Sequence, residues 1–392
     1  MKKNNKIERH VSLRMTRLFM KFIGMWYPKN SRDSSLSNLI IIYTIIAQVI
    51  GLIIMLIDIY YIRSDLRAIA FNLPVTITII QELIKMTKFL CNIKDVQRLN
   101  EFTEKNFWKL NYDKAELKIL EKCNQRCILS CGTFFLFILA IDVHYIFIPF
   151  LEHDKYNRSS RQLPFNMYFK FAELTPYYEL CYFIQSAATI GVTVCTTAFI
   201  SHLFTLNIYA AGQFQILQRK MTMSHCQNEN KEPNSLQVAT SSFDNLKICI
   251  KQHQMLIKYI NMIENLYNPI TFILALGAVC TICLTGFQLV VGVDMTFHRT
   301  ALSFEFFVAS VIMLFMACYC CQAIIIESLA VGDAAYAATW YTPDVKDQKA
   351  YKQALMFIML RSKKNCIITV GKLAPMSIEI FTVVIVVLLI FF

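Results

Sequence analysis

The sequence predicts an all-α membrane protein that crosses the bilayer seven times, with its N-terminus in the cytoplasm and its C-terminus outside. Seven apolar stretches are each about 20 residues long, the length that a helix needs to span the hydrocarbon. Of the 39 Lys and Arg residues, 31 fall in four segments that alternate with three segments holding seven. Since basic flanks stay in the cytoplasm during insertion, this asymmetry sets the orientation.

The chain is predicted to form one domain over residues 1–392, because no linker, repeat or low-complexity tract divides it. The seven spans are placed at residues 39–61, 66–90, 128–149, 177–206, 270–291, 301–326 and 366–392. Two cytoplasmic segments, 250–268 and 350–360, carry apolar stripes at helical spacing, so we expect a cytoplasmic helical anchor region. Those stripes must be buried against each other or against neighbouring subunits.

Ahead of the first span, residues 11–26 have the pattern of an amphipathic helix. Arg14, Arg17 and Lys21 share one face of this helix. Apolar residues recur at helical spacing on another, namely Val11, Met15, Leu18, Phe22, Met25 and Trp26. An interfacial helix on the membrane and a packing helix buried in the cytosolic part both fit this pattern.

Ionisable residues inside the predicted spans are candidates for function, because burying them in lipid is costly. Glu82 and Lys85 lie at the inner end of the second span, where an ion pair or a reach to the interface would accommodate them. Asp142 and His144 in the third span are two residues apart and therefore point in different directions on a helix. We expect them to act as separate hydrogen-bonding groups.

Aromatic residues cluster in the outer halves of the third, fourth and sixth spans. Tyr145, Tyr178, Tyr182 and Phe306 lie at similar depth on these three spans. Lipid contact or an interfacial belt would explain each of them singly. The functional interpretation is an apolar pocket with a few hydroxyl groups, suited to a small volatile or lipid-like ligand.

The last span contains one carboxylate, Glu379, near its middle. At that depth a carboxylate needs water, a partner helix or a lumen, so a pore-lining role and an interhelical hydrogen bond are both open. Gly371 and Pro375 predict a break between an inner half up to about residue 370 and an outer half over 375–392.

Several functions are disfavoured by the sequence. There is no Walker loop, zinc-binding H-E-x-x-H, nucleophile elbow or dinucleotide fingerprint, so we predict no enzyme and no cofactor. The net charge of +12 is explained by cytoplasmic flanks beside anionic lipid headgroups and does not call for nucleic acid. The alternative function is a multi-span transporter of small apolar or cationic solutes, which would predict paired half-sites and internal symmetry.

The loops assigned to the outside contain none of the 14 cysteines, so a disulfide confined to those loops is excluded. The second of these loops carries the sequon Asn157-Arg158-Ser159. Asn157 is therefore a candidate glycosylation site.

The C-terminal third contains a distinctive set of residues: Glu327-Ser328, Ala335-Tyr336, Trp340-Tyr341, Leu360-Arg361-Ser362, Thr369, Gly371-Lys372 and the run Pro-Met-Ser-Ile-Glu-Ile-Phe-Thr at 375–382. This set resembles the C-terminal signature of the insect odorant receptor family. Upstream, residues 24–28, 163–165 and 176–177 and His253 fit more loosely. The loop at 207–268 is too short for the long insertion of the odorant co-receptor, so the chain is similar to a tuning subunit. The tail after 382 is more apolar than is usual in the family.

The resemblance implies a ligand-gated, non-selective cation channel in which tuning subunits join a co-receptor, as a tetramer, in the plasma membrane of a sensory neuron dendrite or cilium. It implies a ligand pocket among the second, third, fourth and sixth spans and a pore lined by the outer half of the last. The candidate ligand-binding residues are Ile79, Ile141, Tyr145, Tyr178, Tyr182, Phe183, Phe306 and Ser310. The candidate pore residues are Glu379, Thr382, Val383, Val384 and Val387, the valines forming an apolar constriction.

Overall fold

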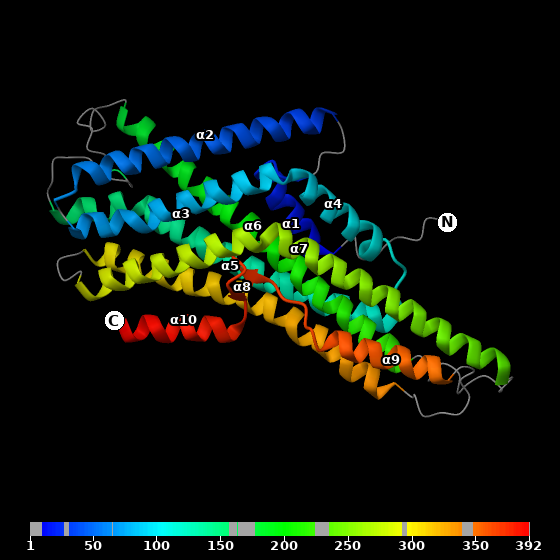
Figure 1. The fold of residues 1–392 in the computed structure, drawn as a ribbon. Coiled ribbons are helices and arrows are strands. Elements are labelled where there is room, and N and C mark those ends of the chain that lie inside the picture. The colour runs from blue at the N-terminus through cyan, green and yellow to red at the C-terminus, as the bar shows by residue number, and fades with distance from the viewer. Residues whose placement is uncertain are drawn as a thin grey trace.

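The computed structural model describes residues 10–26, 31–64, 66–156, 163, 177–223, 235–291, 296–338 and 348–391. Within these ranges the chain is almost entirely helical (Figure 1), which confirms the predicted all-α fold. Asn157 lies outside the described residues, as do parts of the signature such as Trp340. The elements in order are α1 (Val11–Phe22), α2 (Ser31–Tyr61), α3 (Leu66–Cys91), α4 (Ile93–Thr103), the π-helical turn η2 (Glu104–Trp108), α5 (Lys114–Tyr156), α6 (Tyr177–Met223), α7 (Ser235–Val291), α8 (Phe297–Ala337), α9 (Gln348–Ser362), β1 (Thr369–Val370), β2 (Ala374–Pro375) and α10 (Ile378–Phe391).

Six helices among the described residues, α2, α3, α5, α6, α7 and α8, are long and apolar enough to cross a membrane. Helix α10 is a further apolar helix, shorter than these six. Helices α5, α6, α7 and α8 contain 41 to 57 residues. At about 1.5 Å per residue each is longer than about 60 Å, twice the hydrocarbon thickness, so each continues well beyond the membrane.

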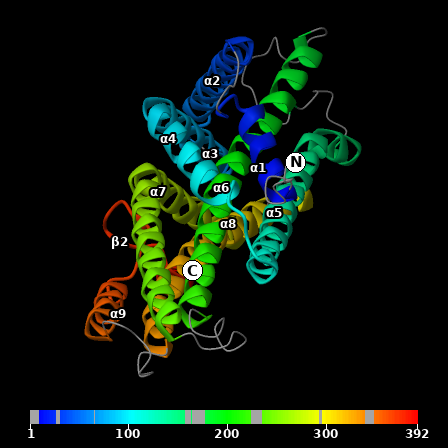
Figure 2. The same cartoon turned by 90° about the vertical axis from the view of Figure 1, so that its right-hand side faces the viewer.

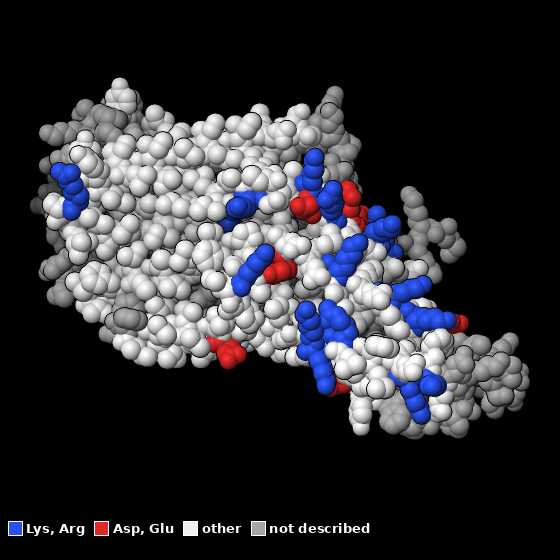
Figure 3. All heavy atoms as spheres, in the orientation of Figure 1, with Lys and Arg blue, Asp and Glu red and all other residues white. Residues whose placement is uncertain are grey.

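These extensions gather at one end of the molecule together with α4 and α9, at the right of Figure 1. We call this end the basic end, because most of the Lys and Arg side chains on the face shown in Figure 3 lie there. The opposite end, which we call the far end, holds the turn from α2 to α3 and the adjoining ends of α7 and α8. The view along the bundle from the basic end shows α6 between α3, α5, α7 and α8 (Figure 2).

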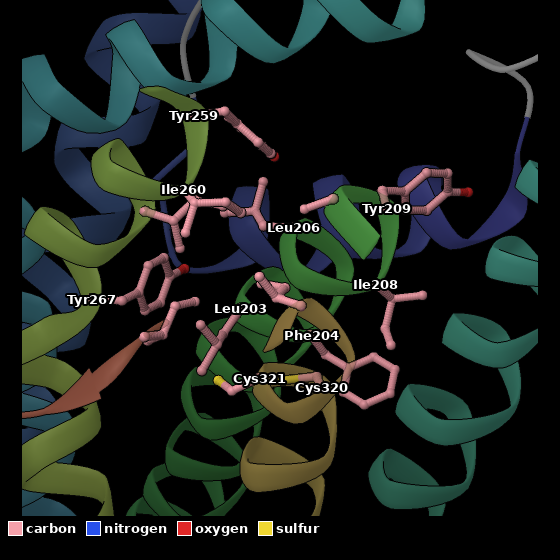
Figure 4. Packing of buried hydrophobic residues seen from close by; sticks show 14 of the residues in the cluster. Leu203, Phe204, Leu206, Ile208, Tyr209, Tyr259, Ile260, Tyr267, Cys320 and Cys321 are labelled. Carbon is pink, nitrogen blue, oxygen red and sulfur yellow. The ribbon is translucent and has the colours of Figure 1, made fainter. Parts of the chain in front are cut away.

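Helix α6 is the centre of the fold and contacts α1, α2, α3, α5, α7 and α8. From Cys195 to Phe214 every residue is buried, on all sides of the helix. A helix buried on all sides belongs in a core. Here Leu203 and Leu206 of α6 point toward the side where Tyr259 and Tyr267 of α7 lie, and Phe204 and Tyr209 point away from it (Figure 4). Cys320 and Cys321 of α8 fill the space opposite, where small polarizable side chains allow close packing.

The apolar stripes of the predicted anchor region are buried within the protomer. Leu256, Ile260 and Ile263 of α7 lie in the main core, and so do Tyr351 and Leu355 of α9. Sequence alone left open whether such stripes would pack against each other or against neighbouring subunits; these five pack inside one chain.

Helix α1 forms where the amphipathic pattern predicts a helix, but only part of the expected apolar stripe is buried. Val11, Leu18 and Phe22 are exposed, whereas Met25 is buried and Met15 and Trp26 pack against the core. The buried face of α1 carries the core residues Leu13, Phe19 and Met20. It also carries Ser12, whose hydroxyl donates to Asn124 Oδ1 at 2.8 Å, and Thr16, whose hydroxyl lies 2.9 Å from that of Thr205. Helix α1 therefore packs against the bundle through both apolar and polar contacts.

The last predicted span is not a kinked helix, and this expectation was wrong for residues 366–377. The chain there forms a two-stranded hairpin in which Thr369 pairs with Pro375 and Val370 with Ala374. Gly371 and Lys372 at its tip have φ of 61° and 63°, a left-handed conformation that ends any helix. Only α10 is helical, and its 14 residues rise about 21 Å, less than the hydrocarbon thickness.

Candidate ligand cavity

A cavity of about 390 Å³ lies among α2, α3, α5, α6 and α8, within the usual size range of small-molecule sites. Six of its lining residues are Gly or Ala, and these leave room where larger side chains would close the bundle. They are Ala47, Gly51, Ala187, Ala188, Gly191 and Ala309. A Cβ atom at Gly191 would meet nothing within 4 Å, and one at Gly51 would only touch Ile79 at 4.0 Å, so the space beside both is open.

The wall is mostly apolar, and three of its buried polar side chains come from three different helices. Gln48 on α2, Glu82 on α3 and Asp142 on α5 all line the cavity and are all buried. Glu82 accepts hydrogen bonds from Lys85 on its own helix and from the hydroxyl of Thr196 at 2.7 Å. Both members of this ion pair are buried, and the Lys85 ammonium also lies 5.8 Å from the centre of the Phe199 ring.

Five of the eight candidate ligand-binding residues line this cavity. They are Ile79, Ile141, Phe183, Phe306 and Ser310. The hydroxyl of Ser310 donates to the Phe306 carbonyl at 2.9 Å, so within its own helix it already has an acceptor. Tyr145 lines a much smaller adjoining hollow, to which Phe306 also contributes.

The remaining candidates, Tyr178 and Tyr182, lie away from the cavity. Their rings stack with centroids 6.2 Å apart, and Tyr182 meets Phe150 edge-on at 5.6 Å. The hydroxyl of Tyr182 donates to the Ile146 carbonyl at 2.7 Å. These contacts hold the far ends of α5 and α6 together.

Sequence reasoning missed the contribution of α2 to this site. Nine of the cavity residues lie on that helix, among them Tyr43, Gln48 and Met55. A signal was present, because Gln48 is a polar residue within a long apolar stretch and such a residue normally faces protein or water.

The cavity has a lateral mouth between α2 and α6. Tyr43, Ile46 and Ile50 of α2 line it and are also exposed on the outer surface. Phe183 and Ile184 of α6 do the same from the other side. We call these five residues the lateral mouth.

Two ionisable groups of the third predicted span point apart, as the spacing indicates. Asp142 lines the cavity, whereas His144 Nδ1 lies 2.9 Å from Glu305 of α8. The ring of His298 lies 5.8 Å from that of His144, so this half-buried cluster belongs to the far end of α5 and α8 and not to the cavity.

The candidate pore residues lie on two faces of α10. Glu379, Thr382, Val383 and Val387 are exposed and follow one another at helical spacing. Val384 is half-buried against the core on the other face, beside Phe381, whose ring meets Phe315 of α8 at 5.4 Å. In a single protomer α10 therefore presents an apolar stripe with one carboxylate near its start.

Comparison with known proteins agrees with this arrangement. The family profile described as 7tm Odorant receptor matches residues 65–387. Odorant receptor 13a of Drosophila melanogaster is 23% identical over 337 residues, which cover 82% of this chain and 78% of the relative. Odorant receptor Or2 of Anopheles gambiae is 24% identical over 269 residues, 67% of each protein.

Solved structures match the fold over nearly the whole chain. The insect olfactory receptor OR5 from Machilis hrabei superposes with a TM-score of 0.80 at 12% identity, covering 99% of this chain and 98% of that one. The same receptor in complex with eugenol gives a TM-score of 0.78 at 14% identity, covering 99% and 96%.

The helices and the cavity define a multi-pass membrane protein of the seven-helix receptor class. Because the family profile matches most of its length, the chain belongs to the 7tm odorant receptor family. It is thus a receptor and not an enzyme.

Proposed function

We propose that this protein is a tuning subunit of an odorant-gated, non-selective cation channel. Its ligand is a small volatile or lipid-like odorant that binds in the cavity among α2, α3, α5, α6 and α8. The observation that carries the proposal is the cavity itself, which has a mostly apolar wall and few polar groups. A receptor of the same fold has been solved in complex with eugenol, which supports a small organic ligand.

The proposed pore wall is the exposed stripe of α10. Glu379, at the start of the helix, would raise the local cation concentration, and Val383 and Val387 would form an apolar gate that closes by dewetting. Val384 faces the core, so it supports the helix from behind. One subunit supplies only part of such a wall, and the proposed partner is an odorant co-receptor in a heterotetramer.

The proposed orientation places the basic end in the cytoplasm. The positive-inside rule supports this placement, because 31 of the 39 basic residues belong to segments on that side. Helix α2 would then contact lipid through exposed side chains such as Leu39 and Ile42. The proposed location is the plasma membrane of a sensory dendrite or cilium.

Co-expression with an odorant co-receptor, followed by an odorant panel under voltage clamp, tests the proposal. We expect inward cation current with at least one ligand, and a shift of about tenfold in its dose–response on Phe306→Ala or Ile141→Ala. Leu276→Ala is the matched control, because Leu276 is exposed on α7 away from the cavity. Normal surface expression with no ligand-evoked current across the panel would contradict the channel, and unchanged curves for both cavity variants would contradict the site.

Glu379→Gln tests the pore separately. We expect modestly altered permeability ratios or current size, because neighbouring subunits supply the rest of the wall. Reduced assembly with unchanged permeability ratios would mean that Glu379 only holds helices together.

A further inference from the structure

Three polar side chains of the cavity meet a single turn of α6. The hydroxyl of Thr193 hydrogen-bonds to Asp142 of α5. The amide of Gln48 on α2 donates to Cys195 Sγ at 3.4 Å, and the hydroxyl of Thr196 donates to Glu82 of α3 at 2.7 Å.

These contacts fix the relative depth of the three groups. Thr193 and Thr196 are three residues apart on one helix, which is a rise of about 4.5 Å. Cys195 lies between them in the chain. Gln48, Glu82 and Asp142, from three separate helices, are therefore held at nearly one level of the cavity wall. We call these three residues the acceptor cluster.

Each member of the acceptor cluster has one oxygen atom with no hydrogen-bond partner among the described residues. The atoms are Gln48 Oε1, Glu82 Oε2 and Asp142 Oδ2. All three side chains are at least 94% buried. A buried polar atom without a partner destabilises the fold, so three such atoms beside one hollow need an explanation.

The unpartnered atoms share one chemistry, because all of them accept hydrogen bonds. Ionised carboxylates only accept, and the amide nitrogen of Gln48 is already used on Cys195. The nearest donor groups are also used. Lys85 and Thr196 both donate to the other oxygen of Glu82, and Thr193 donates to Asp142. At this level the wall therefore presents three acceptor oxygens that still lack a donor.

We propose that the cavity selects ligands that carry a hydrogen-bond donor, a hydroxyl or an amino group, at one end of an apolar body. Asp142 and Gln48 bind the donor. Glu82, held in place by Lys85, supplies a third acceptor at the same depth. This inference rests on the proposed function, since it specifies the ligand class of the same cavity. A hydrocarbon or an ether of the same shape would leave the acceptor oxygens unpartnered.

The test compares ligands of the same size that differ in the donor. Alkanols are paired with isomeric ethers of the same carbon number, and matched primary amines form a third arm. Binding is measured as the thermal stabilisation of the purified full-length subunit, independently of any current. We expect donor ligands to bind about ten- to a hundredfold more tightly than their ethers. The amine arm separates a neutral donor from a cationic one, and a preference for either supports the proposal.

Two variants locate the donor site. Asp142→Asn and Gln48→Met are expected to reduce the alcohol-to-ether preference by about tenfold while the affinity for ethers stays the same. Asp95→Asn is the matched carboxylate-to-amide control, because Asp95 is exposed on α4 and pairs only with Arg98 at the surface. The ligand comparison on the unaltered protein remains decisive if a variant does not fold.

Several results would overturn the proposal. Ethers that bind as tightly as alcohols would show that the acceptor cluster is filled by water or donates a proton itself. If both variants keep the preference for alcohols over ethers, the donor group of the ligand binds elsewhere in the protein. If no ligand of the panel binds, the proposed site is wrong. A donor preference in binding without any evoked current would leave this inference standing and count against the proposed channel instead.

Discussion

Glu82 and Lys85 are each 1% exposed and are paired with each other one turn apart on α3. A charge buried in this way is tolerated when it is paired and hydrogen-bonded, and is very costly when its partner is removed. Thr196 and the Phe199 ring supply the further contacts. The pair therefore helps to fix how α3 packs on α6, at the level of the acceptor cluster.

Removing one partner should be more harmful than removing both. We expect Glu82→Gln or Lys85→Met alone to destabilise the protein by about 3–5 kcal/mol, and the double variant to recover part of that loss. Thermal unfolding is measured for four purified proteins: the unsubstituted protein, the two single variants and the double variant. Asp95→Asn, at the exposed Asp95–Arg98 pair, should cost less than about 1 kcal/mol. Additive effects of the two buried substitutions would contradict the pairing.

The contact of α1 with the bundle should depend on pH through His10. His10 Nδ1 lies 2.8 Å from the Tyr209 hydroxyl, and burial lowers the pKa of His10 below its ordinary value of 6.5, with Glu121 opposing this shift. The folded protein, with α1 packed on the bundle, therefore binds fewer protons at His10 than the unfolded chain does. The contribution of His10 to stability is complete above about pH 6.5 and is lost as the pH falls below it. We expect the melting temperature to fall more between pH 7.5 and 5.5 in the natural protein than in His10→Asn. Equal losses would contradict this role.

At the residue scale, the sequence predicted the chemical character of the site residues better than it predicted where they lie in the fold. The expectation that Glu82 and Lys85 could pair is confirmed by their contact. Tyr178 and Tyr182 matched the composition of a pocket wall, yet Tyr182 contacts Phe150 and a backbone carbonyl. Depth along a helix can be read from the sequence, but the side of the helix that meets a hollow depends on how neighbouring helices rotate.

The hairpin before α10 is held by a polar cluster on α7. Glu264 accepts hydrogen bonds from the backbone N–H of Thr369 at 2.8 Å and from its hydroxyl. Asn268 donates to Glu264 at 3.0 Å and to the Thr369 hydroxyl at 2.5 Å. Because these bonds fix β1, they also fix the start of α10 relative to the core helix α7.

Gly371 at the tip of this hairpin should not tolerate a side chain. A Cβ atom there would lie 2.7 Å from the Phe272 ring, and its φ of 61° is unfavourable for any other residue. We expect Gly371→Ala to cost at least about 1–2 kcal/mol and to lower surface expression. Gly132→Ala on α5 is the control, since no atom lies within 4 Å of that Cβ and alanine favours helix there. Equal stability of the two variants would contradict the tight tip.

The two faces of α10 should differ in access to water if the proposed pore is correct. Val383→Cys and Val387→Cys should react with a charged thiol reagent during ligand-evoked current, and the current should fall. Val384→Cys, on the packed face, should not react. Each native cysteine in the described ranges is free, and nearly all are buried or half-buried, so the unsubstituted receptor measures the background. Reaction at Val384 with none at the other two would place the opposite face of α10 in water.

At the element scale, helices with clear apolar periods could be predicted and the hairpin could not. Gly371 and Pro375 indicated a break, and the simplest break in a long apolar stretch is a kink. The structure instead uses Glu264 and Asn268, about 100 residues earlier in the chain, to hold a non-helical segment. A contact over that separation leaves no local signal.

For the whole molecule, the alternation of basic segments predicts the orientation. On the face shown in Figure 3, most of the Lys and Arg side chains of the described residues lie at the basic end. Sequence therefore predicted the seven-helix class and the family, both of which depend on properties distributed over the entire chain. The cavity depends on six small residues that create space. The space that small side chains leave gives no periodic pattern in the sequence, so it could not be predicted.

The N-terminus should be cytoplasmic. We expect an N-terminal epitope tag to stain only after permeabilisation, because the basic arm would resist translocation. A C-terminal tag is the internal control and should stain in intact cells. Staining of the N-terminal tag without detergent would contradict the orientation.

If the cavity binds the odorant as proposed, the lateral mouth would make the bilayer the reservoir from which the receptor is loaded. Its five residues are exposed and line the cavity between α2 and α6. An apolar odorant would concentrate in the acyl chains before it meets the protein, by about fourfold for each additional methylene group. Across a homologous series, sensitivity to the dissolved concentration would then rise with chain length even when the intrinsic fit is constant. Recovery after wash-out would slow in parallel, since the membrane empties more slowly than the surrounding water.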